Sequence, residues 1–86
     1  MEAYRVIKNP LSTEKAIRLM ETENKLLFVV DKKATKEDVK KAVEKVLKVK
    51  VAKVRTFVNQ KGQKRAYITL SPESLAVDVA TELGLM

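Results

Sequence analysis

Residues 51–70 read VAKVRTFVNQKGQKRAYITL, two runs rich in β-branched and aromatic residues on either side of a short polar segment. Such runs predict strands at residues 51–58 and 64–70. The polar segment at residues 59–63 predicts the turn between them, because Gly62 can take the positive φ that hairpin turns often require. The stretch therefore indicates a β-hairpin, and the rest of the chain is placed around it.

The two strands of this hairpin have chemically different predicted faces, because successive side chains of a strand point to opposite sides of a sheet. One face is mainly apolar: Val54, Thr56, Val58, Ala66, Ile68 and Leu70. The other face is basic and aromatic: Lys53, Arg55, Phe57, Arg65, Tyr67 and Thr69. The first face suits a protein core, and the second suits a partner outside the chain.

The positive charge of the chain is concentrated around the same hairpin. Residues 32–65 hold 13 basic and 3 acidic residues, whereas the rest of the chain holds 5 basic and 8 acidic ones. No acidic residue occurs in residues 45–72, where the cations are Lys45, Lys48, Lys50, Lys53, Arg55, Lys61, Lys64 and Arg65. A basic strand pair with interleaved aromatic residues favours a polyanionic partner, with nucleic acid as the first candidate.

Outward from the hairpin, the amino-terminal half predicts two more strands. A short one at residues 4–8 is closed by Asn9-Pro10, since the residue before a proline avoids helical geometry. Another, at residues 25–30, has apolar side chains on both faces. We therefore expect it in the centre of the sheet, covered on both sides.

Two helices are predicted between these strands. The first begins at Ser12 or Thr13 and runs to about Glu21, with Ala16, Ile17 and Met20 on one stripe. The second begins at Thr35-x-x-Asp38, which is similar to a capping box. Its apolar stripe at helical spacing comprises Val39, Ala42, Val43, Val46 and Leu47.

A third helix follows the hairpin, with Ser71-Pro72 as its start and Gly84 as its stop. Its predicted buried ridge is Leu75, Val79 and Leu83. The order β-α-β-α-β-β-α predicts an α+β sandwich with a small, mainly antiparallel four-stranded sheet. With 86 residues, we expect one domain, residues 1–86.

Composition argues against several classes of function. The chain has no Cys and no His, so it lacks thiolate ligands and the commonest general base. Its close carboxylate pairs, at residues 21 and 23 and at residues 37 and 38, lie beside predicted helix ends. We expect no catalytic residue, metal, cofactor or small-molecule substrate. The longest apolar run, residues 26–30, is too short to span a membrane, and no secretion signal is evident, so we expect a soluble intracellular protein.

Two features have an alternative, purely structural interpretation. On the second helix, Lys33, Lys41 and Lys48 are spaced four residues from Glu37 or Glu44, which is typical of a solvated helix surface. That helix could also lie on an anionic membrane, but its small apolar stripe favours burial in the core. Phe57 and Tyr67 could stack on RNA bases or simply pack under a helix.

Several blocks of the sequence together resemble large-subunit ribosomal protein twenty-three, a universal family. These blocks are NPLSTEKA at residues 9–16, NK at 24–25 leading into FVV at 28–30, ATK at 34–36 with VKKAVE at 39–44, VKV at 49–51 with KVRT at 53–56, and GQKRAYITL at 62–70. Their order and spacing are similar to the family over nearly the whole chain. The resemblance implies the fold and function of that family.

The resemblance implies a ribosomal RNA-binding constituent of the large subunit, cytoplasmic and ribosome-bound, and no catalysis. It implies a place at the rim of the peptide exit tunnel, contact with ribosomal protein twenty-nine, and part of a docking surface for the signal recognition particle. RNA contacts carried over from the family or expected from the basic face are Ser12, Thr13, Lys15, Lys48, Lys50, Lys53, Arg55, Phe57, Lys61, Lys64, Arg65 and Tyr67. Glu14 is the expected factor-docking residue.

The chain departs from some members of the family in two places. Bacterial members have a longer basic arm in the hairpin, whereas the turn here is only residues 59–63, which argues against a role in the tunnel wall. Eukaryotic members add a basic amino-terminal extension, which residues 1–3 do not supply, so an archaeal-type member is expected. The alternatives are a free-standing basic RNA or DNA chaperone and an adaptor whose basic surface binds an acidic protein.

Overall fold

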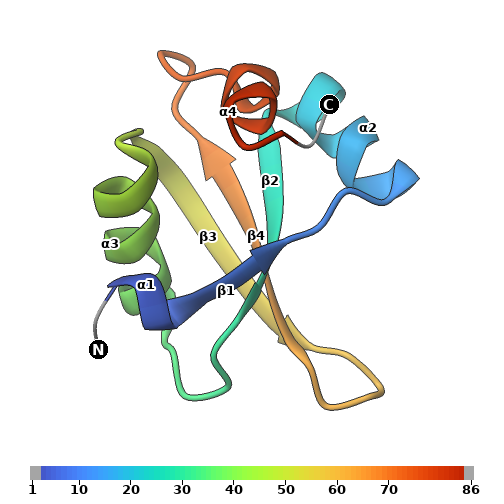
Figure 1. Cartoon of the computed structure of the whole chain (residues 1–86), viewed down its shortest axis with the longest axis vertical. Helices are drawn as coiled ribbons and strands as arrows, with labels where there is room; N and C mark the ends of the chain where they lie inside the picture. Colours follow the sequence, from blue (N-terminus) through green and yellow to red (C-terminus); the bar gives the residue numbers. More distant parts are fainter. Residues whose placement is uncertain (1–2, 85–86) are drawn as a thin grey trace.

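The computed structural model describes residues 3–84, which form four helices and four strands. In chain order they are α1 (Ala3–Val6), β1 (Ile7–Pro10), α2 (Glu14–Glu23), β2 (Lys25–Val30), α3 (Lys36–Leu47), β3 (Val51–Val58), β4 (Lys64–Leu70) and α4 (Ala76–Glu82). Figure 1 shows α3 and α4 gathered beside the sheet. The predicted α+β class and its order of elements are confirmed, with the single turn α1 added before the first strand.

The sheet has the strand order β1-β2-β4-β3, and every pair of neighbours is antiparallel. Strands β2 and β3 are therefore parallel to each other, with β4 inserted between them. Parallel strands need a crossover connection, and α3 provides it. The predicted hairpin of β3 and β4 and the central position of β2 are both confirmed.

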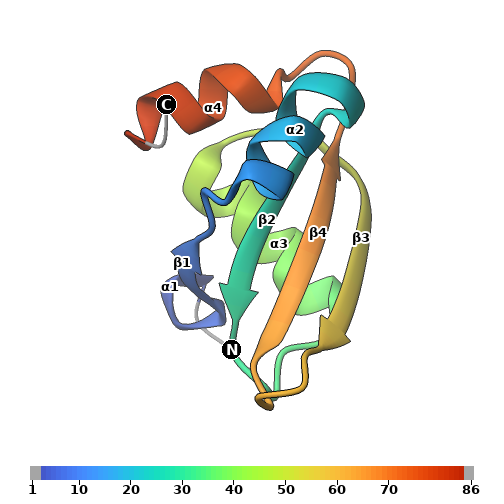
Figure 2. The same cartoon turned by 90° about the vertical axis from the view of Figure 1, so that its right-hand side faces the viewer.

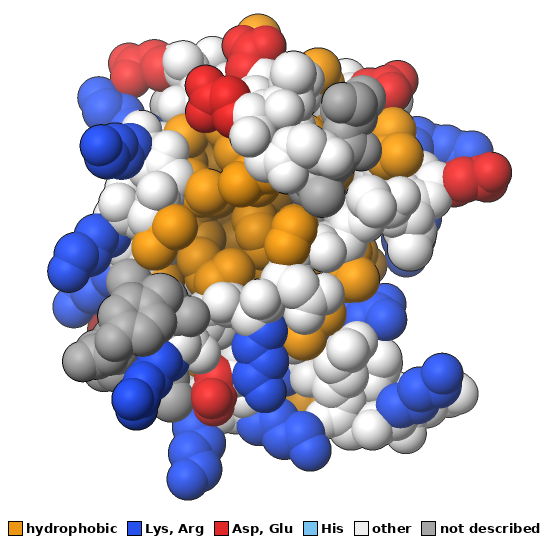
Figure 3. Space-filling view, viewed as in Figure 1, with side chains coloured by type: hydrophobic (Ala, Val, Ile, Leu, Met, Phe, Trp, Pro, Cys, Tyr) orange, Lys and Arg blue, Asp and Glu red, His pale blue; other side chains and the backbone are white. Residues whose placement is uncertain are grey.

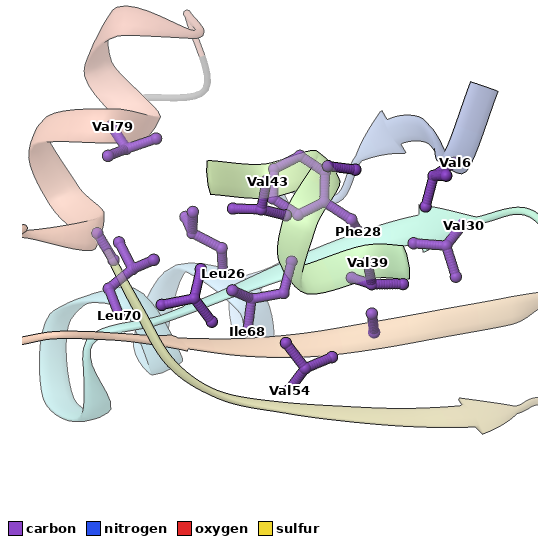
Figure 4. Close-up of a cluster of buried hydrophobic side chains, with 14 of the residues drawn as sticks. Val6, Leu26, Phe28, Val30, Val39, Val43, Val54, Ile68, Leu70 and Val79 are labelled. Atoms are coloured by element: carbon purple, nitrogen blue, oxygen red, sulfur yellow. The ribbon is translucent and has the colours of Figure 1, made fainter. Parts of the chain in front are cut away.

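The main core lies between α3 and one face of the sheet (Figure 4). Leu26, Phe28 and Ile68 from the two central strands meet Val39 and Val43 of α3, and each of these side chains is at most 2% exposed. At one end of this layer α4 contributes Val79. Close packing at such buried positions supplies most of the hydrophobic stabilisation of a small domain.

The opposite face of the sheet has its own apolar strip, and α2 lies over it. Ala16, Leu27 and Val29 are buried but are not part of the main cluster. In Figure 2 α2 lies in front of the sheet and α3 behind it. The prediction that β2 is covered on both sides is therefore confirmed, and only part of this second face remains open.

One face of β3 deviates from strict alternation because of a bulge. Val51 pairs with Leu70 and Lys53 with Thr69, so Ala52 is an extra residue. The bulge lets both Val51 and Val54 reach the core although they are three residues apart. At the other end of the strand the apolar prediction is wrong for Val58, which is 61% exposed because it lies beyond the part of the sheet that the helices cover.

The predicted first strand at residues 4–8 is displaced. Residues 3–6 form the short helix α1, which packs against α3, and the strand β1 begins only at Ile7. The chain turns here because Val6 is 1% exposed and its carbonyl accepts a hydrogen bond from the amide of Asp31 (2.9 Å). Pro10 belongs to the strand and is tolerated because β1 is an edge strand.

The predicted start of the last helix is also wrong, because Asn24 takes over the capping role. Its Oδ1 accepts a hydrogen bond from the amide of Ala76 (2.7 Å), and its Nδ2 donates to the carbonyls of Leu70, Ser71 and Ser74. Residues 71–74 consequently form a turn, and α4 begins at Ala76. The buried residues are Ala76, Val79 and Ala80, whereas the predicted Leu75 and Leu83 are 56% and 39% exposed.

The capping box at the start of α3 is confirmed. The Thr35 hydroxyl accepts from the Asp38 amide (3.2 Å), and the Asp38 carboxylate accepts from the Thr35 amide (3.0 Å). The hydrogen bond from the Thr35 amide is the main reason why the pKa of the Asp38 carboxyl lies below its ordinary value of 3.8. The interaction with the Thr35 hydroxyl lowers this pKa further. Of the predicted stripe, Val39, Ala42 and Val43 are buried, but Val46 is 48% exposed.

Replacing Asn24 by Ala should destabilise the fold by about 2 to 3 kcal/mol, because four hydrogen bonds between the end of α2 and the start of α4 are lost. Urea unfolding followed by circular dichroism measures the change. Asn24 has a φ of 56°, so the matched control is Asn24→Gly, which suits this backbone but still lacks the amide. A loss below about 0.5 kcal/mol for both variants would contradict the capping role.

Replacing Asp38 by Asn should reduce stability near neutral pH but not in acid. A carboxyl whose pKa is lowered by folding stabilises the protein above its unfolded pKa, and this contribution disappears as pH falls through the folded pKa. The difference in thermal midpoint between wild type and Asp38→Asn should therefore shrink below about pH 4. Glu37→Gln, in the same helical turn but outside the capping box, is the control; a difference that persists in acid would oppose this account.

Candidate nucleic-acid interface

The pairing of β3 with β4 gathers the predicted basic and aromatic side chains on one surface. Lys53 lies opposite Thr69, Arg55 opposite Tyr67, and Phe57 opposite Arg65. These three rows form what we call the basic-aromatic face: Lys53, Arg55, Phe57, Arg65, Tyr67 and Thr69. It is on the side of the sheet where α2 lies, because Tyr67 also pairs with Leu27 of β2, beneath that helix.

Two aromatic rings and a lysine form the centre of this face. The rings of Phe57 and Tyr67 are stacked, with centroids 5.0 Å apart and an interplanar angle of 20°. Nζ of Lys15, on α2, lies 5.9 Å from the centroid of the Tyr67 ring, within the range of cation–π attraction. Both rings are half-buried, so they pack against each other and still present surface to a partner.

A groove of about 230 Å³ opens between α2 and the strands β3 and β4. It is lined by Lys15, Leu19, Lys25, Lys53, Arg55, Tyr67 and Thr69. In Figure 2 this is the side of the sheet that faces the viewer. Four of the seven lining residues are cationic and one is aromatic, so the groove has the chemistry of an anion site beside a stacking surface.

The sequence interpretation missed Lys25 and Leu19 as members of this site. Lys25 is at the start of β2, pairs with Thr69 across the sheet and forms an ion pair with Glu23 (3.2 Å). Its alternation with Leu27 was visible in the sequence, but the face that it shares with Lys53 depends on the strand order. Leu19 has no signal of its own, since it lies beside the helical stripe that packs on the sheet.

The hairpin turn is held by the side chain of Asn59. Its Oδ1 accepts hydrogen bonds from the amides of Lys61 (3.0 Å) and Gln63 (2.9 Å), and Gly62 has the predicted positive φ, at 80°. A Cβ added to Gly62 would lie 3.7 Å from Nζ of Lys32, so the turn lies against the loop that precedes α3. Lys61 is exposed at this end of the molecule.

Three of the predicted RNA-binding cations have partners within the protein. Nζ of Lys64 donates to the carbonyl of Ala34 (2.7 Å), and Nε of Arg65 donates to Oε1 of Gln63 (2.8 Å). Lys50 forms an exposed ion pair with Glu73 (3.1 Å). Lys64 is also on the same side of β4 as Ala66 and Ile68, so it does not belong to the basic-aromatic face. By contrast, Lys53 and Arg55 have no ion pair or hydrogen-bond partner for their side chains within residues 3–84.

The predicted contacts outside the hairpin are spread over two other regions. Ser12, Thr13 and Glu14 are exposed at the start of α2, where the Thr13 hydroxyl caps the helix by accepting from the Ala16 amide (3.2 Å). Lys48 is exposed at the end of α3, in the left-handed conformation with a φ of 55°. None of Ser12, Thr13, Glu14 and Lys48 lines the groove, whereas Lys15, the second residue of α2, does.

The charged side chains of α3 face solvent, as expected if they serve only as a solvated helix surface. The ion pairs expected from their spacing are not formed. None of the spaced pairs among Lys33, Glu37, Lys41, Glu44 and Lys48 closes to an ion pair in the described part of the chain. Glu44 instead accepts a hydrogen bond from the Val51 amide (3.3 Å) and so connects α3 to the start of β3.

Residues 3–84 contain neither a long apolar helix nor a cluster of metal ligands. None of the helices there combines the length and hydropathy that a bilayer crossing requires. No group of three or more acidic, Cys or His side chains there is arranged to hold a metal ion.

The sequence matches a model of the ribosomal protein L23 family over residues 5–76. It is also similar to two archaeal proteins, each described as large ribosomal subunit protein uL23. The one from Methanococcus vannielii is 48% identical over 85 residues, and the one from Methanococcus aeolicus is 49% identical over 85 residues. Each alignment covers 99% of this chain and 99% of the relative.

Lys64 should contribute to stability, whereas Lys61 should not. Replacing Lys64 by Met removes a hydrogen bond from a charged donor to the loop before α3, which should cost about 1 to 2 kcal/mol. Lys61→Met, at the exposed turn, should stay within about 0.5 kcal/mol of wild type. Urea unfolding of both variants measures the difference, and equal stabilities would contradict the assignment of Lys64 to the fold.

Proposed function

Because this chain belongs to the ribosomal protein L23 family, whose members are structural proteins of the large ribosomal subunit and not enzymes, we propose that it binds large-subunit ribosomal RNA. The basic-aromatic face is its proposed contact surface, and residues 1–86 act as one RNA-binding unit. The observation that carries the proposal is the pair Lys53 and Arg55: both are exposed, lie in neighbouring rows of the basic-aromatic face, and have no acidic partner within residues 3–84.

The physical argument starts from the cost of gathering like charges. Cations brought together on one sheet face repel each other unless something compensates them. Phosphate groups of RNA provide this compensation, and their neutralisation releases counterions. Binding of this kind depends on the shape and charge of folded RNA and needs no reading of base sequence. If about five phosphates are contacted, log affinity should fall against log salt with a slope of roughly −3.5 to −4.5.

We also propose a finer placement on the ribosome, and membership of the family supports it. We place the protein at the rim of the peptide exit tunnel, next to ribosomal protein twenty-nine, ribosome-bound in the cytoplasm. The turn at residues 59–63 is held compactly by Asn59, which supports a position on the rim and not in the tunnel wall. Glu14, exposed in the first turn of α2, is the proposed contact for the signal recognition particle.

A second surface, in a different part of the molecule, favours contact with a neighbouring protein. Figure 3 shows an apolar hollow between α3 and α4, with acidic side chains gathered near α4. Leu75 and Leu83, which flank α4, are among the exposed large hydrophobic residues of the protein. An apolar surface with an acidic border suits protein better than RNA, because RNA phosphates would be repelled there.

Neutralising the exposed cations should weaken RNA binding without unfolding the protein. The double variant Lys53→Gln with Arg55→Gln removes two proposed phosphate contacts, so the salt slope should become shallower by roughly 1.4 to 1.8. The measurement is binding to large-subunit RNA over a salt series, together with retention on large subunits after a high-salt wash.

The matched control is Lys40→Gln with Lys45→Gln, two exposed cations of α3 on the opposite side of the sheet. This control should leave the salt slope nearly unchanged. Equal losses in the two double variants would assign RNA binding to net charge alone, as expected for a free-standing chaperone. Co-sedimentation with large subunits that survives ribonuclease treatment would instead favour an adaptor bound to an acidic protein.

A further inference from the structure

The groove beside Tyr67 is built differently from the rest of the basic-aromatic face. The three rows of paired residues run from Phe57 and Arg65, through Arg55 and Tyr67, to Lys53 and Thr69. The groove includes the second and third rows but does not include Phe57. Tyr67 thus has two different neighbours: the stacked ring of Phe57 toward the hairpin turn, and open space toward Lys53 and Thr69.

This arrangement gives the two aromatic residues different roles. Phe57 supports Tyr67 from one side and fixes the direction of its ring. Tyr67 also lines the groove, together with Lys15 and Leu19 of α2. An aromatic ring near an aliphatic side chain offers the apolar surface on which an unstacked base is held.

The charges around the groove indicate where a phosphate would lie. Lys25 is already neutralised in part by Glu23, at 3.2 Å, whereas Lys53 and Arg55 have no such partner within the described residues. Lys15 contacts the Tyr67 ring, at 5.9 Å, and has no ion pair within residues 3–84. An anionic group is therefore best accommodated beside Lys53 and Arg55, and the uncharged part of the same ligand beside Leu19 and Tyr67.

We propose that this groove holds one unpaired nucleotide of RNA, with its base stacked on Tyr67 and its phosphate beside Lys53 and Arg55. The proposal rests on the RNA-binding function proposed above and adds a defined single-stranded contact to it. Lys15 moves from the ring to the phosphate when the base enters, because both lie within reach of its flexible side chain. Thr69 also lines the groove, and its hydroxyl can donate to or accept from the edge of the base.

The absence of Trp from the chain provides a direct test, because a single introduced Trp reports on its own surroundings. Tyr67→Trp and the matched Phe57→Trp each place one indole on the basic-aromatic face. Oligo(U) should quench the fluorescence of Tyr67→Trp strongly and that of Phe57→Trp weakly. An abasic ribose-phosphate oligomer of the same length should bind through its charge but leave Tyr67→Trp unquenched.

Affinity measurements on a second set of variants keep the test independent of the Trp substitution. Tyr67→Leu should lose about 5- to 150-fold in affinity for oligo(U), the range expected for one stacked base, whereas Tyr67→Phe should retain it. Binding of the abasic oligomer should be the same for both variants.

Two outcomes overturn the proposal in distinguishable ways. If the RNA probes bind with the expected salt dependence but the abasic oligomer quenches Tyr67→Trp as strongly as oligo(U), the groove holds no base and the proposed function stands. If neither oligo(U) nor large-subunit RNA binds at low salt, both the groove ligand and the proposed function are wrong.

Discussion

The constraint on which this structure depends is the position of β4 between two parallel strands. Residues 65–69 of β4 each pair with both neighbouring strands, so their alternating side chains form the centre of two surfaces at once. Ala66 and Ile68 lie under α3 in the core, while Arg65 and Tyr67 lie on the opposite face. A shift of one residue in this pairing would bury charges and expose the core, so the register that stabilises the fold also assembles the candidate site.

Because the sheet has two different faces, this small protein can bury a core on one face and expose a basic surface on the other. A helix on each face of the sheet is needed to cover β2, and α2 covers only the strip formed by Leu27 and Val29. The remaining area, over β3 and β4, is left without a helix. Charged and aromatic side chains occupy it because nothing in the chain covers it, and this is where a groove can open beside α2.

The side chain of Asn24 connects α2 to α4. It ends α2 in a left-handed conformation and at the same time caps α4, which is more than fifty residues later in the sequence. The helix that forms one wall of the groove is thereby tied to the helix that closes one end of the core. The groove therefore lies between a fixed helix and a hydrogen-bonded sheet. Little conformational entropy of the backbone should be lost when a ligand binds there.

The sequence alone determined the features that depend on neighbouring residues: the hairpin from its alternation and Gly62, the capping box from Thr35 and Asp38, and the resemblance to a ribosomal protein family from blocks in register. It could not place features that depend on distant residues. The predicted start of α4 was wrong because its cap comes from Asn24, and the hydrogen bond from Lys64 to the Ala34 carbonyl was not foreseen because the two residues are thirty positions apart. The groove joins α2 to three strands, so only the tertiary structure could decide it, because local periodicity says which side chains share a face but not which faces meet.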